Sequence, residues 1–478
     1  MAAPARSNVL IALTLVGGVA AGAAAWNVSP GSAPQAHPSS PPVLDLRRMA
    51  VSPLTSAADQ PVAIFHAFND KYSDVAGYVC QVGAQGYSHV QISPAQKSNP
   101  DPAWWARYQP VDYRVIEGPL GTEADLAALI QKAHGCGVRV IADVVFNHMA
   151  NLGHVGLSFP GMAAQDFHTQ CCIDYGLRDS VINCWLGCDL PDLDQSKPDV
   201  QSAHRAHLQK LVDLGIDGFR FDAAKHMSVD AVAAYIAVVN QITHGNSWNY
   251  LEVIEDGTTS AETYDSVATV TDFILYGSMK AAFSFGGDLR TLRVPTAVGD
   301  PRSVTFGRNH DQVPELNSKA INPYADASDS YLATAYVLAH ASGTPLVLNR
   351  DNLASPFVPF GARFRQILAQ RGRAGADVRE NALGVIDSGV LLAMERGTEG
   401  LFVVNKAAEV FDTPAVDLTL TNLEGCYHEL RNNFTIAIER RSDGKKYITR
   451  WGTWNRGGMQ VQARDALYFL RAPWSECQ

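Results

Sequence analysis

The sequence predicts an α/β protein: a closed (β/α)8 TIM barrel with a small domain inserted after the third strand and an antiparallel β-domain at the C-terminus. Eight short β-rich runs alternate with segments of helical periodicity from residue 61 to about 350. About fifty residues separate the third run from the next helix, and the alternation stops near residue 380. A doubly wound open sheet is the alternative. The count of eight favours the barrel, and no Gly-rich phosphate loop follows the first run.

The eight runs are expected to form the barrel strands, and they are "VAIFHAF" (62–68), "YSHVQIS" (87–93), "VRVIADVVF" (138–146), "GFRF" (218–221), "NYLEVIE" (249–255), "DFILY" (272–276), "SVTFG" (303–307) and "PLVLN" (345–349). Helical segments between them carry boundary signals. "TEADLAALIQKAHGCG" begins with a Thr cap and ends in Gly, and "VQSAHRAHLQKLVDLG" also ends in Gly. Beyond residue 380, "GVLLAMERG", "GLFVVNKA", "AVDLTL" and "ALYFLRA" are strand-like and separated by turn residues, which is typical of an antiparallel sheet.

The N-terminus has the pattern of a secretory signal peptide. Arg6 precedes the apolar run "VLIALTLVGGVAAGAAAW", and Ala23 and Ala25 fit an A-x-A cleavage rule. An uncleaved membrane anchor is the alternative, because the run is about long enough to span a bilayer. We therefore expect a secreted or periplasmic protein. The expected segments are a signal peptide (1–25), a Pro/Ser-rich linker (26–60), the barrel (61–378), the inserted domain within it (149–198) and the C-terminal β-domain (379–478).

Composition and cysteine content limit the class of protein. The chain has 478 residues, of which 46% are hydrophobic, as in a folded globular protein, and its net charge of −10 argues against nucleic-acid binding. Export would place its eight cysteines in an oxidising compartment, so disulfides are expected. A zinc site is the alternative for the cluster of four at 171–188, but no metal-binding spacing supports it. The spacing does not fix the pairing; we expect Cys80–Cys136, Cys426–Cys477 and two bridges within the cluster.

Polar residues gather where four of the predicted strands end. In a (β/α)8 barrel these ends meet at one rim, where catalytic groups lie. A single carboxylate there could simply face water, but several together concentrate like charge and push their pKa values apart. One ionised and one protonated carboxyl group are what retaining glycoside hydrolysis needs. The residues are Asp143, Asn147 and His148 after the third strand; Arg220, Asp222, Lys225 and His226 after the fourth; Glu252, Glu255 and Asp256 after the fifth; and Asn309, His310 and Asp311 after the seventh.

These strand ends also resemble a known family. "DVVFNH", "GFRFDAAKH", "EVIE" and "FGRNHD" are similar, in order, to the four signature segments of the α-amylase family of glycoside hydrolases (family thirteen). "LPDLD" (190–194) resembles a fifth segment, in the insertion. "WWARYQPVDYRV" (104–115) resembles the substrate platform of animal-type and related bacterial secreted α-amylases. The resemblance covers residues 61–350 well and continues more weakly through the C-terminal domain.

The resemblance implies a role for each matching residue. Asp222 matches the nucleophile, Glu252 the general acid/base and Asp311 the carboxylate that stabilises the transition state. Glu255 is a rival for the acid, but the family pattern places the acid at the Glu of "EVI". The "WW" pair could instead be ordinary core. The implied substrate-binding residues are Trp105, Tyr108, Gln109, His148, Arg220, Lys225, His226 and His310.

The resemblance also implies a calcium ion and argues against chloride. Asn147 and Asp192 match side-chain calcium ligands, and His226 matches a backbone-carbonyl ligand; a hydrogen-bonded loop without metal is the alternative. The remaining ligands, near Asn183, are not assigned. Arg220 and Asn309 match two ligands of the chloride that animal-type relatives bind. The third position aligns near Leu346, which cannot bind an anion, and Arg350 lies too far along the strand, so chloride is not expected.

The expected function is therefore that of a secreted, endo-acting α-amylase. It would hydrolyse internal α-1,4-glucosidic bonds of starch-type and glycogen-type glucans with retention of configuration, through a covalent glycosyl-enzyme intermediate. The expected partner is an α-glucan polysaccharide, and the protein is expected to be a monomer. A glucanotransferase with the same catalytic residues and a catalytically inactive glucan-binding protein are the alternatives. Arg308 and the eighth strand, "GTPLVLNRDN", depart from the usual family pattern.

Overall fold

Eight parallel strands close into a barrel, as the sequence predicts. The structure is a computed structural model that describes residues 59–153, 157–293, 302–316, 318–380, 389–414, 417–418, 422–452 and 458–478. The barrel closes where Ile64 on the first strand pairs with Leu346 on the last. The barrel strands are β1 (Ile64–Ala67), β2 (His89–Ile92), β7 (Arg139–Val144), β8 (Gly218–Phe221), β9 (Trp248–Leu251), β10 (Thr269–Thr271), β11 (Ser303–Thr305) and β12 (Thr344–Leu348).

The sixth strand lies earlier in the chain than predicted. The run "DFILY" (272–276) was expected as a strand, but β10 is Thr269–Thr271 and the helix α7 (Phe273–Phe283) follows at once. The side chain of Asp272 accepts a hydrogen bond from the backbone N–H of Leu275 at 2.8 Å and caps this helix. The apolar run therefore begins a helix. Asp272 acts as its N-cap and satisfies the backbone N–H of Leu275, which has no partner within the helix.

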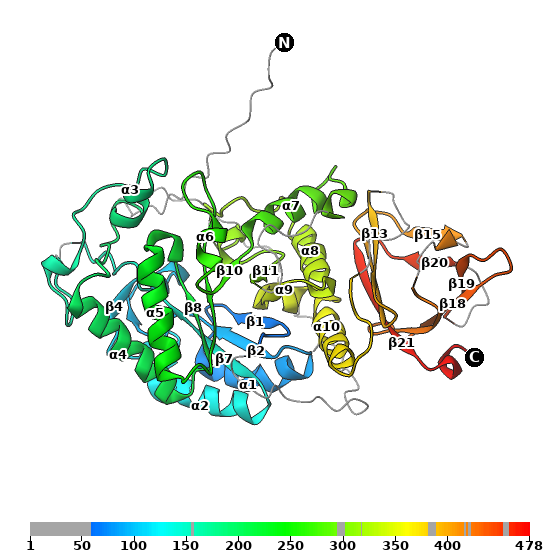
Figure 1. Ribbon diagram of the computed structural model, residues 1–478, viewed down its shortest axis with the longest axis horizontal. Coiled ribbons are helices and arrows are strands. Elements are labelled where there is room, and N and C mark those ends of the chain that lie inside the picture. Colours follow the sequence, from blue (N-terminus) through cyan, green and yellow to red (C-terminus); the bar gives the residue numbers. More distant parts are fainter. Residues whose placement is uncertain are drawn as a thin grey trace, which may run out of the picture.

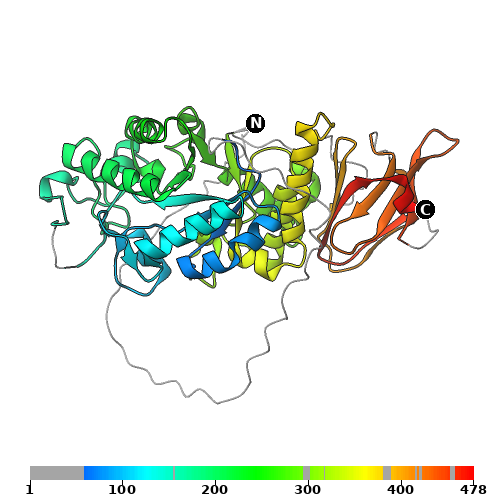
Figure 2. The ribbon, with the colours of Figure 1, turned by 90° about the horizontal axis from the view of Figure 1, so that it is seen from below.

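Helices lie on the outside of the strands (Figures 1 and 2). The cap of α2 is a capping box, in which Thr122 and Asp125 exchange hydrogen bonds between side chain and backbone. Gly215, with φ of 103°, ends α4 in the left-handed conformation that glycine adopts without strain. The longer helices are α1 (Tyr72–Ala84), α2 (Glu123–Gly135), α4 (Pro198–Leu214), α5 (Val229–Ile242), α7, α8 (Ala327–Ala339) and α10 (Val358–Arg373); α6 (Ala261–Asp265) and α9 (Asn349–Ala354) are short.

The insertion between β7 and α4 contains the short helix α3 (Arg178–Asn183) and little other regular structure. It lies at the end of the molecule away from the C-terminal sheet (Figure 1). Two disulfides join its segments, Cys171–Cys184 and Cys172–Cys188. A second excursion from the barrel holds the strands β3 (Lys97–Ser98) and β4 (Pro110–Asp112) with the 3-10 helix Trp104–Tyr108 between them, followed by the hairpin of β5 (Glu117–Gly118) and β6 (Gly121–Thr122).

The C-terminal domain is an antiparallel sheet, as predicted. Its strand order is β13-β14-β21-β17-β18-β19-β16, and β15 pairs with β20 beside it. Lys406 joins it to the barrel, because its ammonium donates to the carbonyls of Ala282 at 2.7 Å and Ser284 at 2.9 Å, at the end of α7. The strands are β13 (Leu391–Arg396), β14 (Gly400–Asn405), β15 (Phe411–Pro414), β16 (Asp417–Leu418), β17 (Gly425–Glu429), β18 (Thr435–Arg440), β19 (Lys446–Trp451), β20 (Gly458–Val461) and β21 (Asp465–Ala472).

All eight cysteines are paired, which confirms the expectation of disulfides. Cys80–Cys136 joins α1 to the residue after α2, and Cys426–Cys477 joins β17 to the C-terminal segment, as expected from the sequence. The pairing within the cluster, which the sequence left open, is Cys171 with Cys184 and Cys172 with Cys188.

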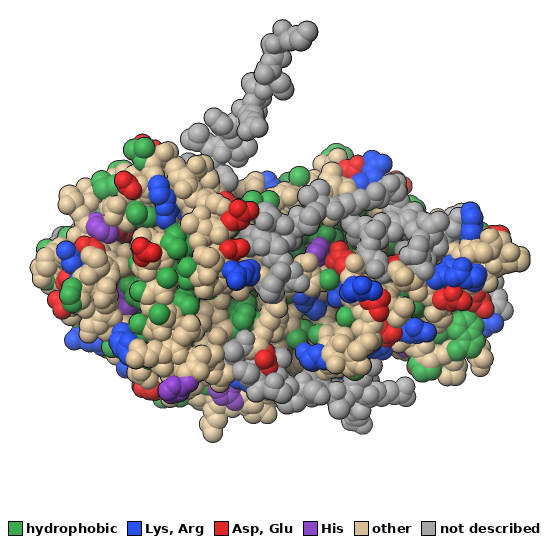
Figure 3. Space-filling view, viewed as in Figure 1, with side chains coloured by type: hydrophobic (Ala, Val, Ile, Leu, Met, Phe, Trp, Pro, Cys, Tyr) green, Lys and Arg blue, Asp and Glu red, His purple; other side chains and the backbone are tan. Residues whose placement is uncertain are grey.

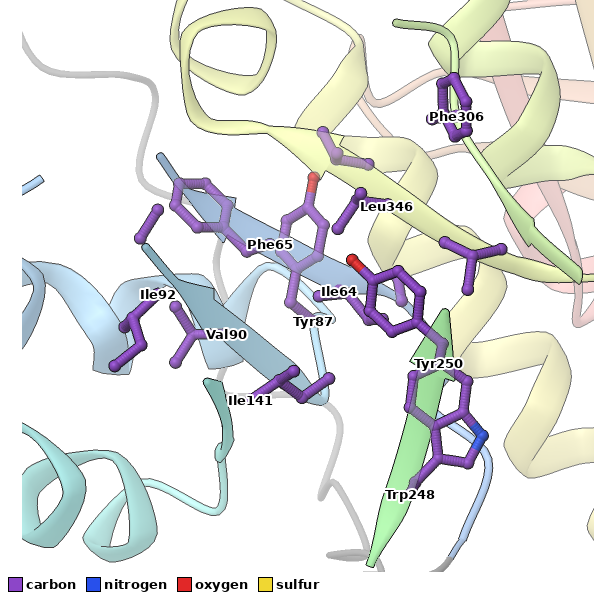
Figure 4. Close-up of a cluster of buried hydrophobic side chains, with 14 of the residues drawn as sticks. Ile64, Phe65, Tyr87, Val90, Ile92, Ile141, Trp248, Tyr250, Phe306 and Leu346 are labelled. Carbon is purple, nitrogen blue, oxygen red and sulfur yellow. The ribbon is translucent and has the colours of Figure 1, made fainter. Parts of the chain in front are cut away.

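The barrel strands and their helices share one hydrophobic core. Figure 4 shows part of it, with Ile64 of β1, Leu346 of β12 and Tyr250 of β9 among the buried side chains. On the face drawn in Figure 3, acidic and basic side chains of the described residues are interspersed. No helix in the described part of the chain has the length and hydrophobicity to cross a membrane. The predicted signal peptide, and the linker up to residue 58, lie outside the described residues, and the domain boundaries stay predictions.

Candidate active site

Arg220 stands at the centre of a buried cluster of carboxylates. Its Nη1 donates to Oδ2 of Asp143 at 2.8 Å and to Oδ1 of Asp222 at 2.6 Å, and its Nη2 forms an ion pair with Oε1 of Glu252. Asp143 pairs with Arg220 across β7 and β8, and Asp222 follows two residues later on the same face. Strand alternation therefore brings these groups together, as the sequence predicts.

The turn after β8 links Asp222 to Glu252. Ala223, the next residue, has φ of 47°, a left-handed conformation that is uncommon for a residue with a Cβ. In this conformation its backbone N–H donates to Oε2 of Glu252 at 3.0 Å. The backbones are paired as well, since the N–H of Glu252 donates to the carbonyl of Phe221 at 3.0 Å. Both carboxyl groups are therefore held by the same short segment.

Burial raises the pKa values of the carboxyl groups in the cluster. Burial raises the pKa of Glu252 to about 6; Arg220 opposes the shift, and the charges of Asp222 and Asp311 add to it. Burial likewise raises the pKa of Asp311 to about 6 and that of Asp143 to about 8, again against Arg220. The pKa of Asp222 is raised too, mainly by burial. The Arg220 guanidinium opposes all four of these upward shifts without cancelling them.

An aromatic stack lies beside the carboxylates. The ring of His310 stacks on Phe68, with centroids 4.5 Å apart, and on Tyr108 at 5.3 Å. The Tyr108 hydroxyl donates to Oδ2 of Asp143 at 3.1 Å, and the Tyr108 carbonyl lies 3.0 Å from Nε2 of His148. Burial lowers the pKa of His148 to about 4 and that of His310 to about 3, so both imidazoles are neutral at ordinary pH.

The two tryptophans of the predicted platform differ in their surroundings. Trp104 is half-buried, its Nε1 donates to the carbonyl of Leu316 at 2.9 Å, and its ring packs edge-on against Tyr108 and His310. Trp105 is half-buried as well. Gln109 is also partly exposed, and its Oε1 accepts from Nδ2 of Asn99 at 2.7 Å. All three side chains therefore keep some surface available for a ligand, although the ring of Trp104 also packs against the stack.

Lys225 and His226 face the insertion rather than the Arg220 cluster. The ammonium of Lys225 donates to Oδ2 of Asp256 at 2.7 Å and lies 5.2 Å from the ring centre of Tyr175. Nδ1 of His226 is 3.2 Å from the carbonyl of Val181 in α3. Both side chains are buried. They belong to the turn after β8, and their side chains contact the insertion, on the side where the resemblance places the aglycone and the ion.

Glu255 makes a hydrogen bond outside the Arg220 cluster. Its Oε1 accepts from the backbone N–H of Ala261 at 3.0 Å, at the start of α6. Glu252, in contrast, contacts both Arg220 and Ala223. Of the two glutamates, Glu252 is thus the one next to Asp222.

Known proteins resemble this chain over most of its length. The family model of the α-amylase catalytic domain matches residues 78–155. An α-amylase of Aeromonas hydrophila is 32% identical over 419 residues, which cover 76% of this chain and 87% of that protein. The chain belongs to the α-amylase family. An α-amylase-related protein of Drosophila ananassae is 33% identical over 319 residues, which cover 60% of this chain and 64% of that protein.

Solved structures of α-amylases share the fold. α-Amylase I of Eisenia fetida superposes with a TM-score of 0.70 at 20% identity, over 87% of this chain and 99% of that one. The α-amylase of Geobacillus thermoleovorans, solved with acarbose, gives 0.65 at 19% identity, over 88% of this chain and 100% of that one. These two likenesses show the fold, while membership of the α-amylase family rests on the Aeromonas relative. The chain is accordingly a glycoside hydrolase of the α-amylase family, which confirms the resemblance stated above.

Two of the calcium ligands that the α-amylase resemblance implies, Asn147 and Asp192, are in contact where the insertion meets the barrel. Nδ2 of Asn147 donates to Oδ1 of Asp192 at 3.0 Å, and Nδ1 of His168 is 2.7 Å from the other carboxylate oxygen. Oδ1 of Asn147 is buried and has no hydrogen-bond partner among the described residues. No three His, Cys, Asp or Glu side chains converge into a metal centre in the described ranges. A cation here would therefore depend on the Asp192 carboxylate together with the Asn147 amide and backbone carbonyls, which are ligands that calcium accepts.

Asp143 and Arg178 were not assigned a role from the sequence. Asp143 was recognised only as a strand-end carboxylate, yet it holds Nη1 of Arg220 and the hydroxyl of Tyr108. Strand alternation places it beside Arg220 and could have indicated this contact. Arg178, in the insertion, donates to the turn after β8. No local pattern links residues so far apart, so only the structure reveals this contact.

Proposed function

We propose that this chain is an endo-acting α-amylase that hydrolyses internal α-1,4-glucosidic bonds of starch-type and glycogen-type glucans with retention of configuration. The observation that carries the proposal is the contact of one buried arginine, Arg220, with both Asp222 and Glu252. Burial raises the pKa of both groups, that of Glu252 to about 6, and Arg220 opposes both shifts. The α-amylase resemblance assigns the nucleophile to Asp222 and the acid to Glu252. Retaining hydrolysis needs this pair of one nucleophile and one acid.

In the first step Oδ of Asp222 attacks the anomeric carbon and forms a C–O bond to the sugar. The glycosidic C–O bond breaks, its electron pair stays on the leaving oxygen, and Glu252 gives its proton to that oxygen. In the second step Glu252, now ionised, takes a proton from water, and the water oxygen displaces Asp222 from the anomeric carbon. Two inversions at one carbon give net retention.

The remaining site residues are proposed to bind the glucan. Asp311 would hold sugar hydroxyls at the cleavage point as charge develops on the ring, with the neutral imidazoles of His148 and His310 as hydrogen-bonding partners. Trp105 and Tyr108 would offer ring faces to the C–H faces of glucose units, and Gln109 would bond to a hydroxyl. Lys225 and His226 would contact the aglycone side. Arg220 would keep Asp222 ionised.

A calcium ion is proposed where the insertion meets the barrel. Asn147 and Asp192 would hold it through side-chain oxygens and His226 through its carbonyl. Oδ1 of Asn147 supports this proposal, because it is buried and has no hydrogen-bond partner among the described residues. A buried acceptor without a partner costs free energy of folding. Such an ion would supply no chemistry to the bond cleavage; it would fix the insertion to the barrel.

Export to a secreted or periplasmic location is proposed from the N-terminal sequence, and the four disulfides support it. The protein is proposed to act as a monomer.

The activity can be tested on soluble starch with the purified protein. New reducing ends should appear while the iodine-staining length of the polymer falls quickly, as endo cleavage requires. Transfer to a sugar hydroxyl would instead leave the number of reducing ends nearly constant, and an inactive binding protein would change neither signal. NMR of the first products on a short maltooligosaccharide should show the α-anomer. Initial appearance of the β-anomer would contradict retention.

A further inference from the structure

We propose that Arg178 of the insertion is a positioning residue for the reaction, because it fixes the turn that aims Asp222. This inference rests on the proposed function, since it takes Asp222 as the nucleophile. Arg178 does not touch the Arg220 cluster in any contact of the described residues; it acts through the backbone between Asp222 and α5.

The guanidinium of Arg178 holds two carbonyls of that turn. Its Nη1 donates to the carbonyl of Lys225 at 2.7 Å, and its Nη2 donates to the carbonyl of Met227 at 3.1 Å. The same two nitrogens bond to the side chains of Thr259 at 3.0 Å and of Tyr264. A planar guanidinium with donors in a fixed fork can span these acceptors, whereas the single ammonium of a lysine cannot.

The turn needs such support, because its backbone is held in an unfavourable conformation. Ala223 has φ of 47°, and a residue with a Cβ stays there only when its surroundings fix it. Within the turn, the N–H of His226 donates to the carbonyl of Ala223 at 2.8 Å and that of Met227 to Ala224 at 3.1 Å. Without Arg178 the Lys225 carbonyl would lose this donor, and the Met227 carbonyl would keep only the bond from the Tyr264 hydroxyl at 2.6 Å. The weakened turn would let Ala223 relax, which would move Asp222 and withdraw the Ala223 N–H from Glu252.

Arg178 lies in a loop of the insertion that two disulfides close. Residue 178 lies within the segment closed by Cys171–Cys184 and within that closed by Cys172–Cys188. The helix that begins at Arg178 also contacts the turn through the Val181 carbonyl, 3.2 Å from Nδ1 of His226. The two disulfides limit the freedom of the loop, and we infer that they serve the geometry of the active site as well as stability.

The test measures nucleophile attack directly, with 5-fluoro-α-glucosyl fluoride as the probe. Asp222 attacks the anomeric carbon, the C–F bond breaks, and fluoride leaves with the electron pair without needing a proton from Glu252. Mass spectrometry follows the covalent adduct over time, well below the melting temperature of each variant. Arg178→Met and Arg178→Lys should form it about 10- to 100-fold more slowly than the wild type, as expected when a reacting group is misplaced. Arg205→Met is the matched control, since Arg205 contacts only Gln241 in the described contacts.

Two further measurements separate positioning from other roles. Guanidinium ion should restore part of the labelling rate of Arg178→Ala but not that of Asp222→Asn. The double variant Cys171→Ser/Cys184→Ser should slow labelling, while Cys426→Ser/Cys477→Ser, which opens a distant disulfide, should leave the rate unchanged. On starch, the Arg178 variants should lose kcat with little change in KM.

The outcomes distinguish this inference from the proposed function. If the wild type hydrolyses starch and is labelled, but Arg178→Met is labelled as fast, the inference is wrong. It is also wrong if excess calcium fully restores the variants, because Arg178 would then act only through the metal. A wild type that is neither labelled nor active would instead refute the proposed function on which the inference depends.

Discussion

The backbone N–H of Ala223 donates a hydrogen bond to Oε2 of Glu252 across 3.0 Å. Ala223 directly follows Asp222, so this bond fixes the proposed nucleophile relative to the proposed acid through main chain rather than through flexible side chains. Arg220 adds a second tie, because it contacts both carboxylates. Retaining enzymes hold these two groups about 5 Å apart, and such main-chain ties suit that demand.

Asp222→Asn should nearly abolish hydrolysis, by about 10,000-fold or more, because an amide cannot form the covalent intermediate. Binding of starch should persist, since the aromatic and imidazole groups remain. The measurement is kcat on soluble starch together with retention of the variant on an amylose column. Near-normal turnover would show that Asp222 is not the nucleophile.

Glu252→Gln should lower kcat by about 100- to 10,000-fold, the usual contribution of a general acid. Glu255→Gln is the matched control, because Glu255 accepts a hydrogen bond from Ala261 and does not contact Arg220 in the described structure. Its kcat should change little. The two variants are compared on the same maltooligosaccharide, and a larger loss in Glu255→Gln would reverse the assignment of the acid.

The pH dependence should be bell-shaped with a mildly acidic optimum. Glu252 must be protonated to act as the acid, and its pKa is raised to about 6, so kcat/KM should fall as the pH rises through about 6. Asp222 must be ionised, and its pKa is raised above its ordinary value, so the acidic limb should lie above that of a free aspartate. Rates measured across the pH range on one substrate test both limbs. A profile that stays flat from acidic to alkaline pH would contradict this assignment.

Chelation of calcium should lower the melting temperature. A ligand that binds only the folded state stabilises it by about 3 kcal/mol when its concentration is 100 times Kd, so a large shift is expected on removal. Asp192→Ala should have a lower melting temperature than the wild type and should not respond to the chelator. Calorimetry with and without chelator measures both. An unchanged wild-type transition in excess chelator would argue against the metal site.

Chloride should have little effect on the rate. Leu346, near which the resemblance places the third chloride ligand, lies in the hydrophobic core on β12, and Arg350 is exposed on α9. Arg308, another cation in this region, is buried and already pairs with the carboxylate of Asp351 at 2.7 Å. Activity is measured against pH in chloride-free buffer, then with sodium chloride, and with sodium sulfate at matched ionic strength as the control. A large, chloride-specific rise in rate with an alkaline shift of the optimum would show that another residue completes an anion site.

The fold could be predicted where the sequence repeats a strong local pattern. β7 (RVIADV) and β8 (GFRF) lie in predominantly apolar runs, and both were placed correctly to within a few residues. β10 was misplaced because it has only three residues, two of them Thr, and gives no period to recognise. The more apolar residues after Asp272 suggested a strand, although they form α7.

The site could be predicted in part, because strand order alone brings the strand ends to one rim. Asp222, Glu252 and Arg220 are among the strand-end residues named on that ground, and the family resemblance then implies their roles. The structure places them in contact, while their roles stay predictions. Contacts across long stretches of chain had no such signal. Neither periodicity nor spacing indicates that Arg178 reaches Met227, or that Trp104 packs against His310.

The pairing of Ile64 with Leu346 closes the barrel by joining its first strand to its last. During synthesis β1 can pair with β2 early, but its other edge has no partner until β12 has left the ribosome. An open sheet edge invites pairing with other chains, and contacts between distant segments form slowly. Closure is therefore a late event in the life of this chain, and a nascent chain is vulnerable to aggregation until its eighth strand arrives.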